Sequence, residues 1–255
     1  MARLIVPRRL GHEEEASLVE HLTELRHRLV FCLIAIVPAF GLAYAFHERL
    51  IDRLKDLLPA GTPLVTLGVT EPFTTSLKVS FYVALAIVLP VLLWQIWAFL
   101  APAVSEDIQR VIGIFVVMAT GLFVAGVAFC YTIVLPKALT FLVDYDSELY
   151  EEQIRASYYL SFVTLTLFAF GIAFQMPIFI LALVRIGVLS SDRLRRNRRI
   201  GYVAMLSFAI LLPTVDPVSL ALEVVPLFVL FELSIWLSVL MERRWERSAA
   251  EAEAL

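Results

Sequence analysis

Long apolar stretches separated by short polar segments run through the whole chain. A helix needs roughly 20 apolar residues to cross the hydrocarbon core of a bilayer. By that measure the pattern predicts six membrane-spanning helices, at residues 27–46, 73–99, 110–135, 158–186, 200–213 and 218–240. The fifth is unusually short, because residues 200–212 would rise only about 20 Å as a helix. The pattern therefore predicts an all-α integral membrane protein.

A charged segment directly precedes the first apolar stretch. Leucines fall on one helical stripe at Leu18, Leu22, Leu25 and Leu29. Glu20, Glu24 and Arg28 follow one another at intervals of four residues, with the acids first, which is the order that favours ion pairing on a helix. We therefore expect an amphipathic helix whose carboxylates, held at a membrane surface, could receive a cationic partner.

The positive charges predict how the helices are oriented. With the N-terminus inside, the inner segments hold fifteen of the 21 Lys and Arg residues. Because cytoplasmic loops are enriched in Lys and Arg, both termini are predicted to be cytoplasmic. Residues 1–16 and 245–255 are then cytoplasmic tails without regular structure, on either side of a membrane domain at 17–244.

Prolines inside the predicted spans change the expected shape of the bundle. Four of them interrupt apolar stretches, at Pro38, Pro90, Pro177 and Pro226. Proline removes a backbone donor and bends a helix. The sequence therefore predicts a kinked, concave bundle rather than a straight one.

Composition narrows the class of protein. Hydrophobic residues make up 60% of the chain and charged residues only 18%, which excludes an ordinary soluble domain. The chain lacks the nucleotide-binding, zinc-protease and nucleophile-elbow motifs, and Cys32 and Cys130 have no metal-ligand spacing. We expect no enzyme, no cofactor and no metal site, and nothing in the charge pattern indicates nucleic acid.

Few polar side chains fall within the spans, and each needs a partner or a purpose. Lys78 lies near the start of the second span, where it can extend to the surface. Gln175 precedes Pro177 and is either a hydrogen-bonding link between helices or a contact site. Glu223 and Glu232 are nine residues apart, so they face opposite sides of the sixth helix. Asp216 precedes a proline and fits a turn.

Several segments together resemble the TatC family, the multispanning receptor of the twin-arginine protein translocase. Residues 20–29 match its E-H-L-x-E-L-R-x-R-L opening. Further matches follow in order: Pro72-Phe73, Lys78, Pro90, WQIWAFLAPA at 94–103, SYYLSF at 157–162, FGIAFQMP at 170–177, Asp216, Ser219, Pro226 and Phe231-Glu232. The resemblance extends over roughly residues 18–242.

The resemblance implies a fold and a function. It implies six spans in a glove-like arrangement, both termini in the cytoplasm, and short fifth and sixth helices. It also implies a receptor for twin-arginine signal peptides in a Sec-independent translocase. Such a translocase moves folded proteins across the cytoplasmic membrane, driven by the proton-motive force. The partners implied are TatA-like and TatB-like single-span proteins, the lipid bilayer and further copies of the chain.

The resemblance also implies which residues bind the signal peptide. Glu24 would receive an arginine of the signal, because a carboxylate accepts two parallel hydrogen bonds from a guanidinium. Leu25, Arg26 and Phe99 would shape that site. The family's second, inner-loop glutamate aligns with Ile108 here, so Glu106 or Asp107, just before it, is expected to supply that charge.

Three polar positions of the later helices are expected to contact partner helices or to act there: Gln175, Asp216 and Glu232. Gln175 stands where the family often has glutamate, and Leu220 stands where it usually has glutamine. Pro90, Lys78 and Pro226 are expected to be structural.

Two other classes of protein remain open at this point. A small-solute secondary transporter would need a binding site at the membrane midplane, for which only Gln95, Gln175 and Glu223 are available. The absence of an internal repeat weakens that alternative. The other possibility is a structural membrane scaffold that binds no cargo of its own.

Overall fold

The structure, a computed structural model, describes residues 18–59, 62–100, 106–145, 153–211 and 217–253. Five helical stretches in it are long and apolar enough to cross a membrane: His21–Ala45, Glu71–Phe99, Gly113–Asp144, Ala156–Arg185 and Pro217–Glu242. The prediction of an all-α integral membrane protein is therefore confirmed. The expected unstructured tail at 1–16 lies outside the described residues.

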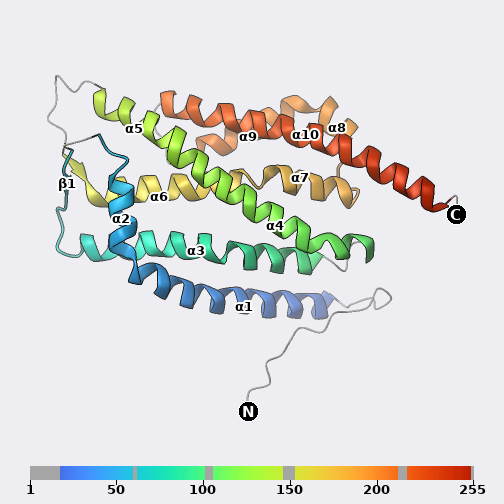
Figure 1. Cartoon of the computed structure of the whole chain (residues 1–255), viewed down its shortest axis with the longest axis horizontal. Helices are drawn as coiled ribbons and strands as arrows, with labels where there is room; N and C mark the ends of the chain where they lie inside the picture. Colours follow the sequence, from blue (N-terminus) through green and yellow to red (C-terminus); the bar gives the residue numbers. More distant parts are fainter. Residues whose placement is uncertain (1–17, 60–61, 101–105, 146–152, 212–216, 254–255) are drawn as a thin grey trace, which may run out of the picture.

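The long helices lie side by side in one bundle (Figure 1). They are α1 (Leu18–Ala45), α3 (Glu71–Leu100), α4 (Glu106–Phe129) with its continuation α5 (Leu135–Asp144), α6 (Ala156–Ala173) with α7 (Met176–Arg185), and α10 (Pro217–Glu253). The start of α1 and the end of α10 lie at the same end of the bundle, on the right in Figure 1. We call this the inner end, and the opposite one the outer end.

Between α7 and α10 the chain forms two short helices, α8 (Ser191–Arg196) and α9 (Arg198–Ile210). The 13 residues of α9 agree with the short fifth helix expected from the sequence. They rise about 20 Å, less than the thickness of an ordinary bilayer core. A sixth complete crossing therefore stays a prediction.

The third apolar stretch ends later than predicted. It continues beyond residue 135 as a π-helical turn, Cys130–Val134, and then as α5 to Asp144. Pro136 occupies the first turn of α5 and so does not end the helix. A π turn shifts the backbone bonding by one residue, which accommodates the donor that proline lacks.

The predictions of a short sixth helix and of an unstructured tail from residue 245 are wrong. Helix α10 has 37 residues and continues to Glu253. Residues 242–253 consist almost entirely of Ala, Glu, Arg and Ser, and the first three are strong helix formers. Helix propensity therefore extends α10 beyond its apolar part.

The prolines affect the helices unequally. Pro177 follows a break at Phe174 and Gln175 that separates α6 from α7. By contrast, α1, α3 and α10 continue as single helices through Pro38, Pro90 and Pro226.

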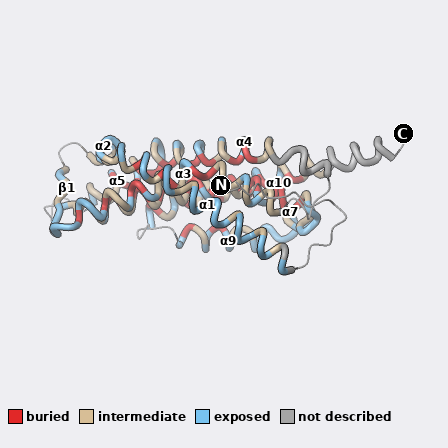
Figure 2. The backbone as a smooth tube through the Cα atoms, turned by 90° about the horizontal axis from the view of Figure 1, so that it is seen from below, coloured by how far each residue is buried: buried red, intermediate tan, exposed pale blue. Residues whose placement is uncertain are grey.

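Buried residues concentrate where the later helices meet, whereas α1 is peripheral (Figure 2). The main core lies between α3, the π turn, α5 and α6, with Phe170 and Leu135 fully buried. A second core joins α7, α9 and α10 around Leu227 and Phe231. Helix α1 packs along α3 through small side chains, among them Ala39, Ala43 and Ala84. Only 11% of the most apolar part of α1 is buried.

A small cap covers the outer end of the bundle. The cap includes the short helix α2 (His47–Lys55), which buries Leu54. Tyr131 and Tyr159 donate hydrogen bonds to the carbonyl oxygens of Arg53 and Leu54. Two short parallel strands, β1 (Leu64–Val65) and β2 (Ile154–Arg155), join the loops before α3 and α6.

Candidate functional site

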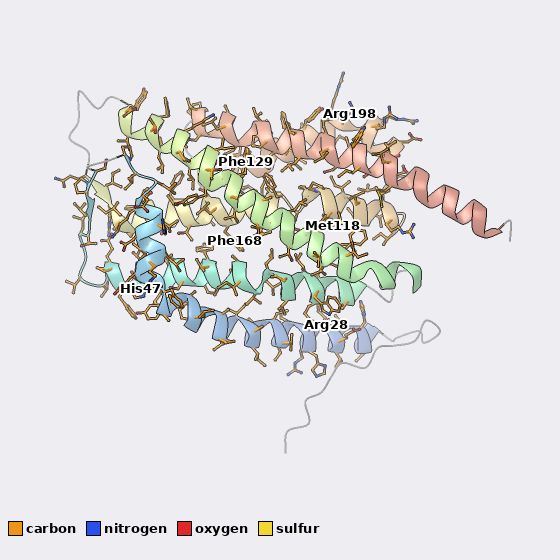
Figure 3. The ribbon with its side chains drawn as sticks, in the orientation of Figure 1. Arg28, His47, Met118, Phe129, Phe168 and Arg198 are labelled. Atoms are coloured by element: carbon orange, nitrogen blue, oxygen red, sulfur yellow. The ribbon has the colours of Figure 1, made fainter. Side chains whose placement is uncertain are left out.

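The charged face of α1 packs against the inner end of α3. Arg28 donates from Nε to Glu24 Oε1 at 3.0 Å and makes a second, shorter bond to the same oxygen from a terminal nitrogen. The other terminal nitrogen donates to Gln95 Oε1 at 3.0 Å, and the terminal nitrogen that bonds Glu24 also donates to the Ala98 carbonyl at 3.2 Å. Figure 3 shows Arg28 at this end of α1, beside α3. A single guanidinium thus connects Glu24 to the second long helix.

One oxygen of Glu24 is left available. Only 14% of the side chain is exposed, and Oε2 has no hydrogen-bond partner among the described residues. The imidazole of His21 lies beside this oxygen, with its Nδ1 3.9 Å from Oε2. The His21 ring is stacked on Phe99, with ring centroids 4.2 Å apart. A buried acceptor without a donor costs free energy, so Oε2 is a ready acceptor for an incoming donor.

The apolar face of this part of α1 points away from the bundle. Leu22 and Leu29 are 64% and 59% exposed, whereas Glu24 and Arg28 are mostly covered. The arrangement reverses that of a helix in a soluble protein, and it suits a helix whose outer face meets lipid. The charged groups are therefore held against α3 and do not face lipid.

The structure brings together only part of the predicted binding site. Glu24 and Phe99 belong to one cluster, which we call the inner-end patch and which also contains His21, Arg28 and Gln95. Leu25 and Arg26 are exposed on α1 instead. Glu106 begins α4, but its side chain and that of Asp107 lie outside the described residues.

Two members of the patch were missed as site residues, His21 and Gln95. The spacing of His21, Glu24 and Arg28 by three and four residues could have placed the histidine on this face. No local sequence signal could have placed Gln95 there, because its contact joins residues 67 positions apart.

A second charged cluster ties the outer cap together. Glu71, at the start of α3, is buried and accepts four hydrogen bonds: from the backbone N–H groups of Leu67, Gly68 and Ser157, and from Arg155 Nε at 2.9 Å. The bond from Arg155 to the Glu71 carboxylate raises the pKa of the arginine. Sequence reasoning did not identify Glu71, because two of its donors come from the loop before α3 and the other two from β2 and the start of α6.

The polar residues predicted within the spans do not form one common site. Gln175 donates from Nε2 to the Ala119 carbonyl on α4 at 2.8 Å, which links two helices. Gln95 belongs to the inner-end patch. Lys78 is exposed on α3, consistent with its expected reach toward the surface. Asp216 lies outside the described residues.

Glu232 occupies the contact between α9 and α10. Its Oε1 accepts a short hydrogen bond from the Tyr202 hydroxyl, and its Oε2 lies 3.4 Å from the Arg198 guanidinium. Gly201 lets the helices approach closely, because a Cβ there would lie 1.9 Å from the Phe231 ring. Pro226 lies one and a half turns before Glu232 in the same unbroken helix.

These features define a multispanning α-helical membrane protein with a partly buried carboxylate site at one end of its bundle. Comparison with known proteins gives the family. The family model for the Sec-independent protein translocase protein TatC matches residues 20–226. The chain belongs to the TatC family, so it is a translocase subunit and not an enzyme.

Individual relatives are similar in sequence to this protein along most of its length. It is 34% identical over 230 residues to the Sec-independent protein translocase protein TatC of Escherichia coli strain K12, covering 89% of each chain. It is 33% identical to the TatC protein of Deinococcus radiodurans over 231 residues, covering 88% of this chain and 86% of the relative.

Two crystal structures of the twin-arginine translocase receptor TatC have the same fold. One of them, determined in DDM, superimposes with a TM-score of 0.79 at 34% identity, over 86% of this chain and 99% of the other. The second gives a TM-score of 0.78 over 87% of this chain and 99% of the other, also at 34% identity. Neither the transporter nor the scaffold alternative agrees with these matches.

Proposed function

We propose that the inner-end patch of α1 and α3 receives the paired arginines of a signal peptide. The proposal rests on how the two carboxylate oxygens of Glu24 are hydrogen-bonded. Arg28 occupies Oε1 with two donors, while Oε2 is buried without a hydrogen-bond partner among the described residues. A guanidinium can satisfy Oε2 with a charge-assisted bond, and such bonds are about twice as strong as neutral ones.

The geometry refines how an arginine of the signal would bind. Arg28 need not leave, because it uses one carboxylate oxygen and is also held by Gln95 and Ala98. The incoming arginine would take Oε2 and displace the His21 side chain that now lies beside it. Phe99, released from its stack on His21, would then offer its ring face to the guanidinium. Leu25 and Arg26, exposed on the same helix, would contact flanking residues of the peptide.

The rest of the proposal concerns orientation and assembly. We place both termini in the cytoplasm and the chain in the cytoplasmic membrane. The excess of Lys and Arg in the inner segments supports this, as does the position of the start of α1 and the end of α10 at one end of the bundle. TatA-like and TatB-like single-span helices would pack on the exposed apolar side of α9, at Val203, Leu206 and Ile210. Energy for transport would come from the proton-motive force.

A peptide titration tests the signal-binding site. The purified full chain in detergent is titrated with a fluorescent twin-arginine signal peptide and with the same peptide carrying paired lysines. We expect at least tenfold weaker binding of the lysine peptide, since lysine lacks the planar fork of donors. We expect Glu24→Gln to weaken binding of the arginine peptide by about 10–100-fold, as loss of a charged hydrogen bond of 1.5–3 kcal/mol implies.

The matched control is Glu48→Gln, which removes an exposed acid from α2 at the outer end. It is expected to leave peptide binding unchanged. Equal binding of both peptides, or equal losses in the two variants, would contradict the proposal.

A further inference from the structure

Two contacts place α8 and α9 at different levels along α10. The backbone N–H of Ser191, at the start of α8, donates to Glu242 Oε2 at 3.2 Å. Arg198, at the start of α9, pairs with Glu232 Oε2 at 3.4 Å. Glu232 and Glu242 are ten residues apart on one helix, which corresponds to about 15 Å along its axis. The start of α8 and the Arg198 guanidinium at the start of α9 therefore contact α10 at levels about 15 Å apart.

The start of α9 consequently carries charge at the level of the apolar part of α10. Glu232 lies within the stretch Pro217–Glu242, which is apolar enough to span a membrane. The side chains of Arg198 and Glu232 are nevertheless 44% and 38% exposed. An exposed ion pair at this level needs polar surroundings. On this side of the bundle, water or lipid headgroups must therefore reach deeper than at α8.

We call the surface formed by residues 193–199, at the end of α8 and the start of α9, the α9 notch. Its charge is strongly positive. Five exposed arginines lie within seven residues: Arg193, Arg195, Arg196, Arg198 and Arg199. The acids beside them are Asp192 on α8 and Glu232 and Glu242 on α10. Glu232 is already engaged by Arg198 and by Tyr202. The notch therefore has positive charge in excess and attracts anions.

An apolar groove begins at the same point. It encloses about 620 Å³ between α9 and α10 and is lined by Tyr202, Phe228, Val229, Glu232, Leu233 and Trp236. Arg198 lies one helical turn before Tyr202 and pairs with Glu232, and both of these residues line the groove, so Arg198 lies at its edge. Val229 and Trp236 are 62% and 61% exposed, so the groove is open to an apolar occupant.

We propose that the α9 notch binds an anionic phospholipid. Its phosphate is held by Arg198 and Arg199, and one acyl chain lies in the groove against Val229 and Trp236. A cationic mouth above an apolar channel matches a molecule with a negative head and an apolar tail. Arginine suits the phosphate because its planar donors bind two phosphate oxygens at once. A single-span partner helix would fill the groove but would leave the excess positive charge unmatched.

Trp236 provides a probe inside the proposed site. The full chain is placed in phosphatidylcholine nanodiscs that contain a small fraction of phosphatidylglycerol with brominated acyl chains, which quench tryptophan fluorescence on contact. Matched discs contain the same fraction of brominated phosphatidylcholine. We expect at least twofold stronger quenching by the anionic lipid. Trp236→Phe should remove this difference, because the probe is lost while the site remains.

Two charge variants complete the test. The double variant Arg198→Gln/Arg199→Gln should abolish the preference for the anionic lipid. The matched control, Arg49→Gln/Arg53→Gln, removes two exposed arginines from α2 at the outer end and should retain the preference. Thermal unfolding in the same discs checks that each variant is folded. Equal quenching by both lipids in the unmodified chain would overturn the proposal, as would a preference that survives in the Arg198/Arg199 variant.

Discussion

Arg28 binds Glu24 through only one of the two carboxylate oxygens, Oε1, and uses its remaining donors on Gln95 and the Ala98 carbonyl of α3. The interaction within α1 is thus also the polar contact that fixes α1 to α3. At the inner ends of the two helices the stacked rings of His21 and Phe99 add a second contact, and further along the helices pack through apolar side chains such as Ala39 and Ala84.

Replacing Arg28 with lysine should loosen this contact. Lysine keeps the charge but, with a single nitrogen, cannot reach Glu24, Gln95 and the Ala98 carbonyl together. We expect a loss of about 2 kcal/mol in the free energy of unfolding, in the range for hydrogen bonds to charged groups. Denaturant unfolding in detergent measures it. Arg26→Lys, at an exposed position of the same helix, serves as the control and should be neutral.

Removing the ring of His21 should strengthen signal binding without affecting the carboxylate itself. His21 stacks on Phe99 and lies beside the free oxygen of Glu24, so an incoming arginine must displace it. We expect His21→Ala to lower the Kd for a twin-arginine peptide about two- to tenfold, because the peptide no longer has to break an aromatic contact worth about 0.5–1.5 kcal/mol. The neighbouring exposed His27 gives the comparison, and an equal effect of His27→Ala would contradict this role.

Neutralising Glu71 should open the outer cap. Each of its two oxygens accepts two hydrogen bonds, and a glutamine would direct an NH₂ group at two of those donors. Glu71→Gln should therefore lower the Tm by several degrees and expose the chain around β1 and β2 to protease. The exposed Glu48, also at the outer end, provides a control in Glu48→Gln. If both variants melt at the unmodified temperature, the cap does not depend on this carboxylate.

Enlarging Gly201 should separate α9 from α10. A Cβ there would lie 1.9 Å from the ring of Phe231, which is itself 4% exposed and has no space to move into. Overpacking of this kind costs about 1–3 kcal/mol. Gly121→Ala makes the same chemical change on α4 with nothing within 4 Å, so it is a matched control. Thermal unfolding of both variants should show a loss for Gly201→Ala alone.

The periodic, local part of the architecture could be predicted from the sequence. Apolar length and proline position located the long helices and the break at Pro177, because both depend on neighbouring residues. The predicted ends of two helices were wrong, because a hydropathy pattern contains no information on what extends them. The third apolar stretch continues past Pro136 through a π turn, and α10 continues beyond its apolar part through helix propensity.

The candidate site was predictable only as far as it is local. The spacing of Glu24 and Arg28 on one helix indicated their pairing, which the structure confirms. Phe99 was expected in the site from the family resemblance alone, whereas Gln95 joins it through packing of α3 on α1, and Glu71 accepts hydrogen bonds from residues 84 and 86 positions away. Contacts of this kind depend on the register between helices, which no single segment encodes.

The bonds to Glu71 also have a consequence for biosynthesis. The carboxylate belongs to α3, but two of its donors, Arg155 and Ser157, are made only after α4 and α5. A chain made from its N-terminus therefore carries this glutamate through the insertion of two further helical segments before its ligands exist. Synthesis arrested before residue 155 should leave the outer cap open. The outer cap can therefore close only after α3, α4 and α5 have all been made.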